Sequence, residues 1–253
     1  MKRLGPLLLS FFAAGIGGAS LVLFVYFLFF GVPLAVEITQ SHAGRLAWDG
    51  FLCGIFFLQH SGMIRRGAKK RLARHIPAIY HPALYSIASG TVLFAVILLW
   101  QPSHQLLLDL HGPPRWILLG LSMLAMAGFA WGVHSLREFD PFGTLALRAR
   151  VRGVPPPAAG FVARGPYRSV RHPLYLFTLL LIWGTSRLST DRLLFNVLWT
   201  AWIVVGTKLE ERDLLLDFGD TYQRYQRCVP MLLPLPRFLR RHTPSDAAAG
   251  TPK

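Results

Sequence analysis

The sequence predicts an all-α, polytopic integral membrane protein with about six transmembrane helices and a cytoplasmic amphipathic segment near the C-terminus. Three observations predict this fold class. Hydrophobic residues make up 53% of the 253 residues, more than is usual in a soluble domain. They gather into runs close to the roughly 20 residues that a spanning helix needs. The basic residues gather in alternate loops between these runs.

Four long apolar runs predict the first four spans, at residues 7–36, 46–64, 83–100 and 116–136. The first run follows Lys2 and Arg3, as the apolar part of a signal peptide would. Its roughly 30 uncharged residues are too many for such a peptide, so we expect a helix that ends near Gly31 and Pro33.

Two shorter apolar arms, residues 174–186 and 193–207, predict helices five and six if charged residues lie at their inner ends. From the break near residue 189, Arg171 lies 18 residues back and Glu210 lies 21 residues on. At a rise of about 1.5 Å per residue, both charges reach nearly the same membrane depth on adjacent antiparallel helices. Ionisable residues there indicate a functional site, and a structural ion pair between the helices is the alternative.

The distribution of charge predicts the topology. Of 27 Lys and Arg residues, 23 lie at the N-terminus, at 65–74, at 137–171 and from Lys208 onward. This positive-inside pattern predicts that both termini are cytoplasmic. The basic segment 65–74 is expected to determine topology and to attract anionic lipid. The net charge of +15 comes with no nucleic-acid recognition fold, so no nucleic acid is expected as a partner.

Changes in composition divide the chain into three regions. Residues 1–153 are expected to form a four-helix transmembrane scaffold, with Gly128 and Gly132 as close-packing positions. Residues 154–242 begin with a proline-rich loop and hold a helical hairpin and a cytoplasmic cofactor-binding segment. Residues 243–253 form a small, polar tail for which disorder is expected. No cysteine or histidine spacing predicts a metal site.

A two-part motif carries the chemistry of the chain. Residues 165–175 read GPYRSVRHPLY, and they are followed by Glu210-Glu211, by Tyr222 and Tyr225 three residues apart, and by Val229-Pro230. This pattern resembles the membrane methyltransferase superfamily of isoprenylcysteine carboxyl methyltransferases and phospholipid N-methyltransferases. The string LQHSGM at residues 58–63, the basic segment after it and Tyr85 resemble the bacterial methanethiol S-methyltransferase and NnrU-type branch.

The resemblance implies an enzyme of the bacterial inner membrane that binds S-adenosylmethionine between the last two helices and the tail segment. Arg171 is suited to hold the carboxylate of this cofactor, and Glu210 or Glu211 its amino group. Tyr222 or Tyr225 is suited to pack against its adenine, although both could instead be interfacial anchors. The full set of cofactor-binding residues that we expect is Tyr167, Arg171, His172, Pro173, Tyr175, Glu210, Glu211, Tyr222 and Tyr225.

The expected partners are a small or lipophilic methyl acceptor and membrane lipid, and the oligomeric state stays open. A thiol reacts as its thiolate, so a base is needed, and His172 and His60 are the candidates. His60 and Gln59 could instead be a pair of residues that form hydrogen bonds between helices. We expect Arg171, His172, Glu210 and His60 to be the catalytic residues.

Methanethiol, converted to dimethyl sulfide, is the predicted acceptor, and a prenylcysteine-type carboxylate or a lipid amine is the alternative. An NADPH-dependent sterol-type reductase is disfavoured, because Glu210 and Glu211 would repel the extra phosphate of its cofactor. A non-enzymatic NnrU-like protein is the remaining alternative.

Overall fold

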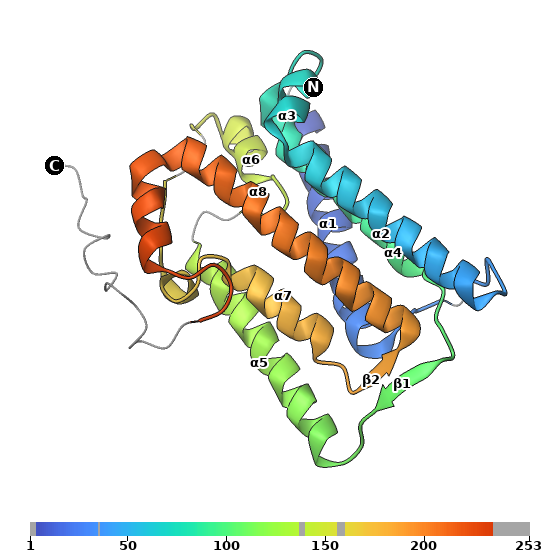
Figure 1. The fold of residues 1–253 in the computed structure, drawn as a ribbon. Coiled ribbons are helices and arrows are strands. Elements are labelled where there is room, and N and C mark those ends of the chain that lie inside the picture. Colours follow the sequence, from blue (N-terminus) through green and yellow to red (C-terminus); the bar gives the residue numbers. More distant parts are fainter. Residues whose placement is uncertain (1–3, 35, 137–139, 156–159, 235–253) are drawn as a thin grey trace. The chain divides into compact units, whose positions relative to one another are not determined.

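The computed structural model describes residues 4–34, 36–136, 140–155 and 160–234, and this part of the chain is mostly helical (Figure 1). The predicted tail, residues 243–253, lies outside the described residues. Within them, strands are limited to β1 (Leu106–Asp109) and β2 (Arg187–Ser189), which pair antiparallel. The predicted helical class is therefore confirmed.

The chain divides into two compact units, which are described one at a time. The first unit holds Met1–Asp109, Asp140–Ala158 and Arg187–Trp199, and the second holds Leu110–Phe139, Ala159–Ser186 and Thr200–Lys253. The first unit contains, in chain order, α1 (Leu4–Phe30), α2 (His42–Ile64), α3 (Arg66–Leu72), the 3₁₀ turn η1 (Ala78–Tyr80), α4 (His81–Leu98), β1, α6 (Leu145–Arg152) and β2.

Helix α4 is central to the first unit, because it packs against both α1 and α2. Small residues permit the close approach of α1. A Cβ atom at Gly90 would lie 3.0 Å from the side chain and 3.1 Å from the backbone oxygen of Ile16. Nearby, the hydroxyl of Ser86 donates to the carbonyl of Ala13 at 3.3 Å. Close contact between the backbones of α1 and α4 therefore stabilises this part of the unit, together with apolar side chains.

Buried polar groups join the ends of several helices in the first unit. The backbone N–H of Gln101 donates to Oδ1 of Asp49 at 2.9 Å, and Nε1 of Trp100 donates to Oδ2 of Asp191 at 3.0 Å. Arg192, only 9% exposed, donates to the carbonyl of Phe27 at 3.1 Å. These bonds satisfy polar groups that would be costly to bury alone.

The second unit is built on α5 (Pro113–Ser135) and α7 (Pro173–Trp183), which pack against each other. The predicted close-packing positions lie at this contact. A Cβ atom at Gly128 would collide with the ring of Phe177, and one at Gly132 would collide with the side chain of Leu174. The 3₁₀ turn η2 (Gly165–Arg168) also packs against α5. Gly128 and Gly132 are therefore close-packing positions, as expected, but the helix that they contact is α7 of the motif-bearing region and not another helix of the predicted scaffold.

Helix α8 (Thr190–Cys228) is the longest helix of the described chain, and its residues from Thr200 on belong to the second unit. It is broken at Gly219, where φ is 51° and ψ is −129°. Only glycine adopts such backbone angles readily. Beyond the break, Tyr222, Tyr225 and Val229 are buried against Phe161. The amphipathic segment predicted near the C-terminus therefore presents its apolar side to its own unit.

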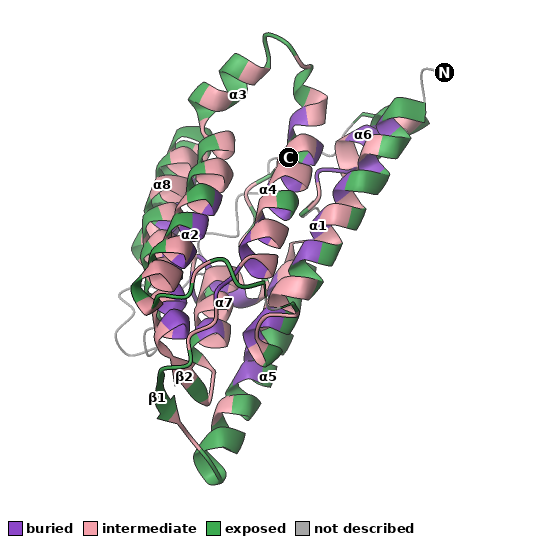
Figure 2. Ribbon diagram, turned by 90° about the vertical axis from the view of Figure 1, so that its right-hand side faces the viewer, coloured by how far each residue is buried: buried purple, intermediate pink, exposed green. Residues whose placement is uncertain are grey.

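Among the residues that the structure describes, four helical segments are long and apolar enough to cross a membrane: Leu4–Phe30, Ala78–Leu98, Pro113–Ser135 and Thr190–Cys228. Helix α5 also exposes large apolar side chains, with Trp116 67%, Ile117 70% and Leu124 71% exposed. Much of the ribbon of α5 has the colour of exposed residues (Figure 2). Such a surface is stable against lipid rather than water. These are the features of an integral membrane protein. The expected second and fifth spans correspond to α2 and to the 11-residue α7, neither of which is among these four, so six spans stay a prediction.

Candidate active site

A turn and two backbone hydrogen bonds place the first half of the motif. Gly165 has a φ of 55° and lies against the side chain of Ser135, where a Cβ atom would not fit. After the η2 turn, the N–H of Arg171 donates to the carbonyl of Pro230 at 2.9 Å, and that of His172 donates to Met231 at 3.1 Å. The two halves of the motif, far apart in sequence, therefore lie side by side at the start of α7.

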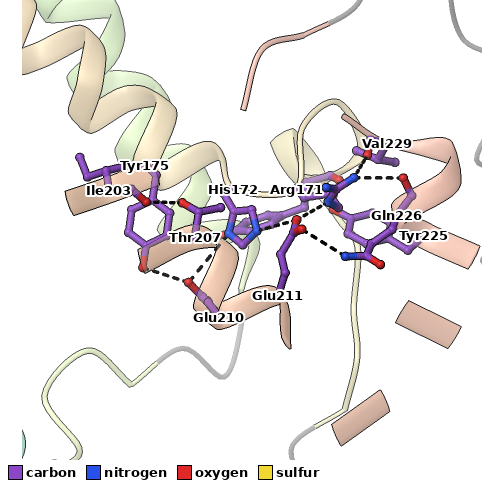
Figure 3. Close-up of polar contacts among 11 residues, drawn as sticks. Arg171, His172, Tyr175, Ile203, Thr207, Glu210, Glu211, Tyr225, Gln226 and Val229 are labelled. Atoms are coloured by element: carbon purple, nitrogen blue, oxygen red, sulfur yellow. Dashed lines mark hydrogen bonds and ion pairs between the residues drawn. The ribbon is translucent and has the colours of Figure 1, made fainter. Parts of the chain in front are cut away.

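Arg171 and Glu211 form an ion pair at this point, with 2.5 Å between Nε and Oε1 (Figure 3). Their side chains are 11% and 13% exposed. Arg171 also donates through Nη1 to the carbonyls of Gln226, at 3.0 Å, and of Val229. Burial of such a pair is costly unless further hydrogen bonds satisfy both partners, and here they do. The spacing predicts that Glu210 reaches the depth of Arg171, but the partner of the arginine is Glu211.

Glu210 has a different environment from that of its neighbour. Its side chain is 44% exposed, and Oε2 accepts a hydrogen bond from the hydroxyl of Tyr175 at 2.9 Å. The same oxygen lies 3.9 Å from Nδ1 of His172. Of the two adjacent carboxylates, Glu211 is thus enclosed by protein donors and Glu210 is the accessible one.

His172 lies between the two glutamates. Its Nε2 is 3.2 Å from Oε1 of Glu211, and its ring stacks on that of Tyr175 with centroids 5.7 Å apart (Figure 3). Burial lowers the pKa of His172, although Glu210 and Glu211 act in the opposite direction. The net effect is a neutral imidazole at neutral pH.

The two tyrosines of the tail segment are core residues of the second unit. Tyr222 is 1% and Tyr225 5% exposed, and both pack against Phe161 with ring centroids within 6 Å, at 5.7 and 5.1 Å. The hydroxyl of Tyr225 donates to the carbonyl of Tyr167 at 2.5 Å. The buried hydroxyl of Tyr222 makes no hydrogen bond of standard geometry in the described part of the chain, but it interacts with the guanidinium of Arg171. Neither tyrosine is an exposed anchor in this fold.

The predicted site residues therefore fall into two groups. Arg171, His172, Tyr175, Glu210 and Glu211 make direct contacts with one another, and Pro173 begins α7 directly after them. Tyr167, Tyr222 and Tyr225 belong to the same unit. Burial raises the pKa of Tyr167, which keeps its phenol neutral.

His60 belongs to the first unit. There the hydroxyl of Tyr85 lies 2.7 Å from its Nε2, and its ring lies 5.1 Å from that of Phe56. The neighbouring Gln59 donates to Ser89 on α4 at 3.2 Å. The predicted hydrogen bonding between helices is thus present at both positions, with Tyr85 as the partner of His60.

Sequence reasoning missed one polar member of the site, Gln226. Its amide donates to Oε2 of Glu211 at 3.1 Å, and its carbonyl accepts from Arg171. A neutral glutamine between Arg224 and Arg227 has the appearance of a solvated position, so nothing in the sequence marked it. Phe161 was also missed, although its place just before the motif and its apolar character were a signal.

The site contains carboxylates, a guanidinium, an imidazole and phenols, and it is set in a mostly apolar helical chain. Within the described residues, no group of three or more His, Cys, Asp or Glu side chains is arranged to hold a metal ion. Fold and site together define an integral membrane protein with a partly enclosed ionic site at the start of α7.

Relatives with known names identify the family. The chain is 33% identical over 228 residues to methanethiol S-methyltransferase 2 of Bradyrhizobium diazoefficiens, covering 88% of this chain and 87% of that protein. It is 34% identical over 207 residues to the methanethiol S-methyltransferase of a Pseudomonas species, covering 81% and 80%. The corresponding protein of Mycobacterium tuberculosis is 33% identical over 230 residues, covering 88% and 93%. The chain belongs to the methanethiol S-methyltransferase family, as the motif predicted.

More distant similarity extends beyond enzymes of that name. Nurim of Rattus norvegicus is 26% identical over 190 residues, covering 72% of each chain. No family model matches the sequence, and no solved structure matches it significantly.

Proposed function

We propose that this protein is an integral membrane enzyme that transfers a methyl group from S-adenosylmethionine to the sulfur of methanethiol, forming dimethyl sulfide. The observation that carries the proposal is identity of about one third, over more than four fifths of the chain, to proteins named methanethiol S-methyltransferase. The ionic site at the start of α7 supports it, because its groups match the charges of the proposed methyl donor.

Two features of the site support binding of this donor. Glu210 presents an accessible carboxylate beside enclosed polar groups, and the buried hydroxyl of Tyr222 lies close to Arg171 without a hydrogen bond of standard geometry. When bound, S-adenosylmethionine supplies a methyl group on a cationic sulfur, next to an amino acid and an adenosine. Aromatic faces favour a cationic sulfur, and carboxylates favour an ammonium group.

The contacts favour separate roles for the two glutamates. Glu211 already accepts from Arg171, His172 and Gln226, so its oxygens have donors. Glu210 is left as the group to bind the amino group of the donor. In Arg171, Nε and Nη1 already donate hydrogen bonds to groups of the protein itself. We therefore assign Nη2 as the nitrogen that binds the carboxylate of the donor.

His172 is the proposed base. Its imidazole is neutral at neutral pH and can therefore take the proton of a thiol. Glu210 and Glu211, next to the ring, stabilise the imidazolium that forms. A thiolate held in a water-poor site, in line with the methyl group, needs little further chemical help. His60 stays a second candidate for this role.

For the membrane arrangement, we propose six spans, both termini in the cytoplasm and a location in the bacterial inner membrane. The scaffold of residues 1–153 and the motif-bearing region of residues 154–242 are part of this proposal. The exposed basic residues of α3 and its flanks support a cytoplasmic position for this loop, where anionic lipid is close.

The test is a product measurement with purified protein in detergent. Methanethiol and S-adenosylmethionine carrying an isotopically labelled methyl group are supplied, and dimethyl sulfide is measured in the headspace by mass spectrometry. Labelled dimethyl sulfide that depends on both substrates and is reduced in Glu210→Gln is the expected result. Saturable binding of S-adenosylhomocysteine without formation of dimethyl sulfide would exclude methanethiol as the acceptor. Absence of this binding would exclude S-adenosylmethionine as the methyl donor.

A further inference from the structure

Gln226 contacts both members of the buried ion pair. Its side-chain amide donates to Oε2 of Glu211 at 3.1 Å, while its backbone carbonyl accepts from Nη1 of Arg171 at 3.0 Å (Figure 3). It lies beyond the break at Gly219, in a segment tied down by the bond from Tyr225 to Tyr167. A residue in this position is able to fix how the carboxylate of Glu211 is turned.

The orientation of Glu211 determines where His172 carries its proton. Because Oε2 of Glu211 accepts a hydrogen bond from Gln226, Oε1 is the oxygen that faces the other two side chains. It lies 2.5 Å from Nε of Arg171 and 3.2 Å from Nε2 of His172. An ionised carboxylate only accepts hydrogen bonds, so the nitrogen that faces it must carry hydrogen. The other ring nitrogen, Nδ1, lies 3.9 Å from Oε2 of Glu210, which is beyond hydrogen-bond distance. The neutral ring is then protonated on Nε2, and Nδ1 is the nitrogen with the lone pair.

We propose that Gln226 is a positioning residue for methyl transfer to a thiol: through Glu211 it keeps the proton of His172 on Nε2 and leaves Nδ1 to accept the thiol proton. This proposal rests on the proposed function. In the step, the S–H bond breaks, its proton goes to Nδ1, and the electron pair stays on sulfur. That pair forms the new bond to the methyl carbon as the bond from this carbon to the sulfonium sulfur of the donor breaks, and the electrons of the broken bond stay on the departing S-adenosylhomocysteine.

A purely structural role is the competing explanation, because Gln226 also links the tail segment to Arg171. The chain provides a matched control in Gln223, an exposed glutamine of the same segment. Gln226→Ala removes the amide that holds Glu211 but keeps the backbone carbonyl that accepts from Arg171. Comparison of Gln226→Ala with Gln223→Ala therefore separates the amide from general effects on the segment.

The first measurement concerns the ring itself and needs no substrate. Protein labelled with ¹⁵N-histidine is examined by long-range ¹H–¹⁵N NMR in detergent, and the signals of His172 are assigned by their loss in His172→Gln. The expected spectrum shows hydrogen on Nε2 in the wild type and in Gln223→Ala, and a mixture of tautomers in Gln226→Ala. A wild-type ring protonated on Nδ1, or an unchanged ring in Gln226→Ala, would overturn the proposal.

The second measurement is the pH profile of dimethyl sulfide formation. Gln226→Ala is expected to lower kcat about tenfold, less than the roughly 10²–10⁴-fold contribution of an acid–base group itself. Gln226→Glu places a second carboxyl beside Glu211, and two adjacent carboxylates do not both ionise readily. Once protonated at lower pH, the new carboxyl can donate as the amide does. The activity of Gln226→Glu relative to wild type should therefore rise as pH falls.

These outcomes separate the proposal from the proposed function. A wild-type protein that forms no dimethyl sulfide contradicts the proposed function, while the NMR result still decides whether Gln226 sets the tautomer. An active wild type with equal kcat and equal pH profiles in Gln226→Ala and Gln223→Ala contradicts the positioning role alone. Loss of thermal stability in Gln226→Ala with an unchanged tautomer would assign the residue to structure only.

Discussion

Arg171 is paired with Glu211, at 2.5 Å between Nε and Oε1, and not with Glu210, whose side chain is 44% exposed. Two glutamates that are adjacent in sequence thus have unlike environments. Three side chains donate to Glu211, whereas Tyr175 donates to Glu210. The pair of carboxylates that the sequence presents as equivalent is divided into an enclosed member and an accessible member.

Substitution of each glutamate by glutamine should therefore have different effects. Glu211→Gln leaves Arg171 buried without its counter-charge, and about 3 kcal/mol of stability should be lost. Glu210→Gln should leave the unfolding temperature nearly unchanged but weaken binding of S-adenosylhomocysteine about tenfold or more, since a charged hydrogen bond is lost. Thermal unfolding and calorimetric titration in detergent measure the two effects. If Glu211→Gln weakened binding and Glu210→Gln lowered stability instead, Glu211 would be the group that binds the donor.

The pH dependence of activity should follow His172. Burial lowers its pKa below the usual value of about 6.5, so the base form persists into mildly acidic solution. Activity should be constant near neutrality and fall only at a pH below that value, as the ring is protonated. The acid limb of kcat against pH should disappear from the residual activity of His172→Gln. An acid limb that persists unchanged in this variant would remove His172 as the base.

The same shift has a consequence for stability. Because the folded state lowers the pKa of His172, the unfolded chain binds this proton more readily. The contribution to stability is fully present above the unfolded pKa of about 6.5 and is lost as pH falls toward the folded value. Thermal unfolding temperatures of the wild type and His172→Gln, measured from pH 8 to pH 5, should therefore converge on the acid side. Parallel curves would contradict a neutral buried ring.

The sequence predicted much of this fold because its signals are local. Apolar runs predicted α1, α4, α5 and the first part of α8. The small-residue pattern marked Gly128 and Gly132 as close-packing positions, but it did not predict α7 as the helix that they contact. The motif located Arg171, His172 and the glutamates. What could not be predicted depends on rotation about helix axes and on backbone turns. One residue along a helix turns a side chain by about 100°, so counting residues could not choose between Glu210 and Glu211. Gln226 contacts Glu211 and Arg171 from beyond the break in α8 at Gly219, and residue spacing along a continuous helix does not predict this contact.

Packing of α7 should tolerate a methyl group at one glycine of α5 and not at another. A Cβ atom at Gly128 would collide with the ring of Phe177, whereas one at Gly120 would meet nothing within 4 Å. Gly128→Ala is expected to cost about 1–3 kcal/mol by overpacking, and Gly120→Ala to be neutral or slightly stabilising. Thermal unfolding distinguishes them. Because Arg171 and His172 directly precede α7, Gly128→Ala should also reduce binding of S-adenosylhomocysteine. Equal stability of the two variants would mean that α5 and α7 are not in close contact.

Labelling of single cysteines should decide whether α2 and α7 cross the membrane. In a background without Cys53 and Cys228, Glu37→Cys precedes α2 and Ala73→Cys follows α3, at exposed positions. Arg152→Cys and Arg187→Cys are corresponding exposed positions on either side of α7. With six spans and cytoplasmic termini, an impermeant maleimide added from the periplasmic side should label positions 37 and 187. Positions 73 and 152 should be labelled only after the membrane is opened.

Equal labelling at positions 37 and 73 would show that α2 does not span the membrane. Equal labelling at positions 152 and 187 would show the same for α7. If α7 did not cross, the charges at its N-terminus would lie at the membrane surface, and the water-poor site required for thiol methylation would have to be enclosed by protein alone.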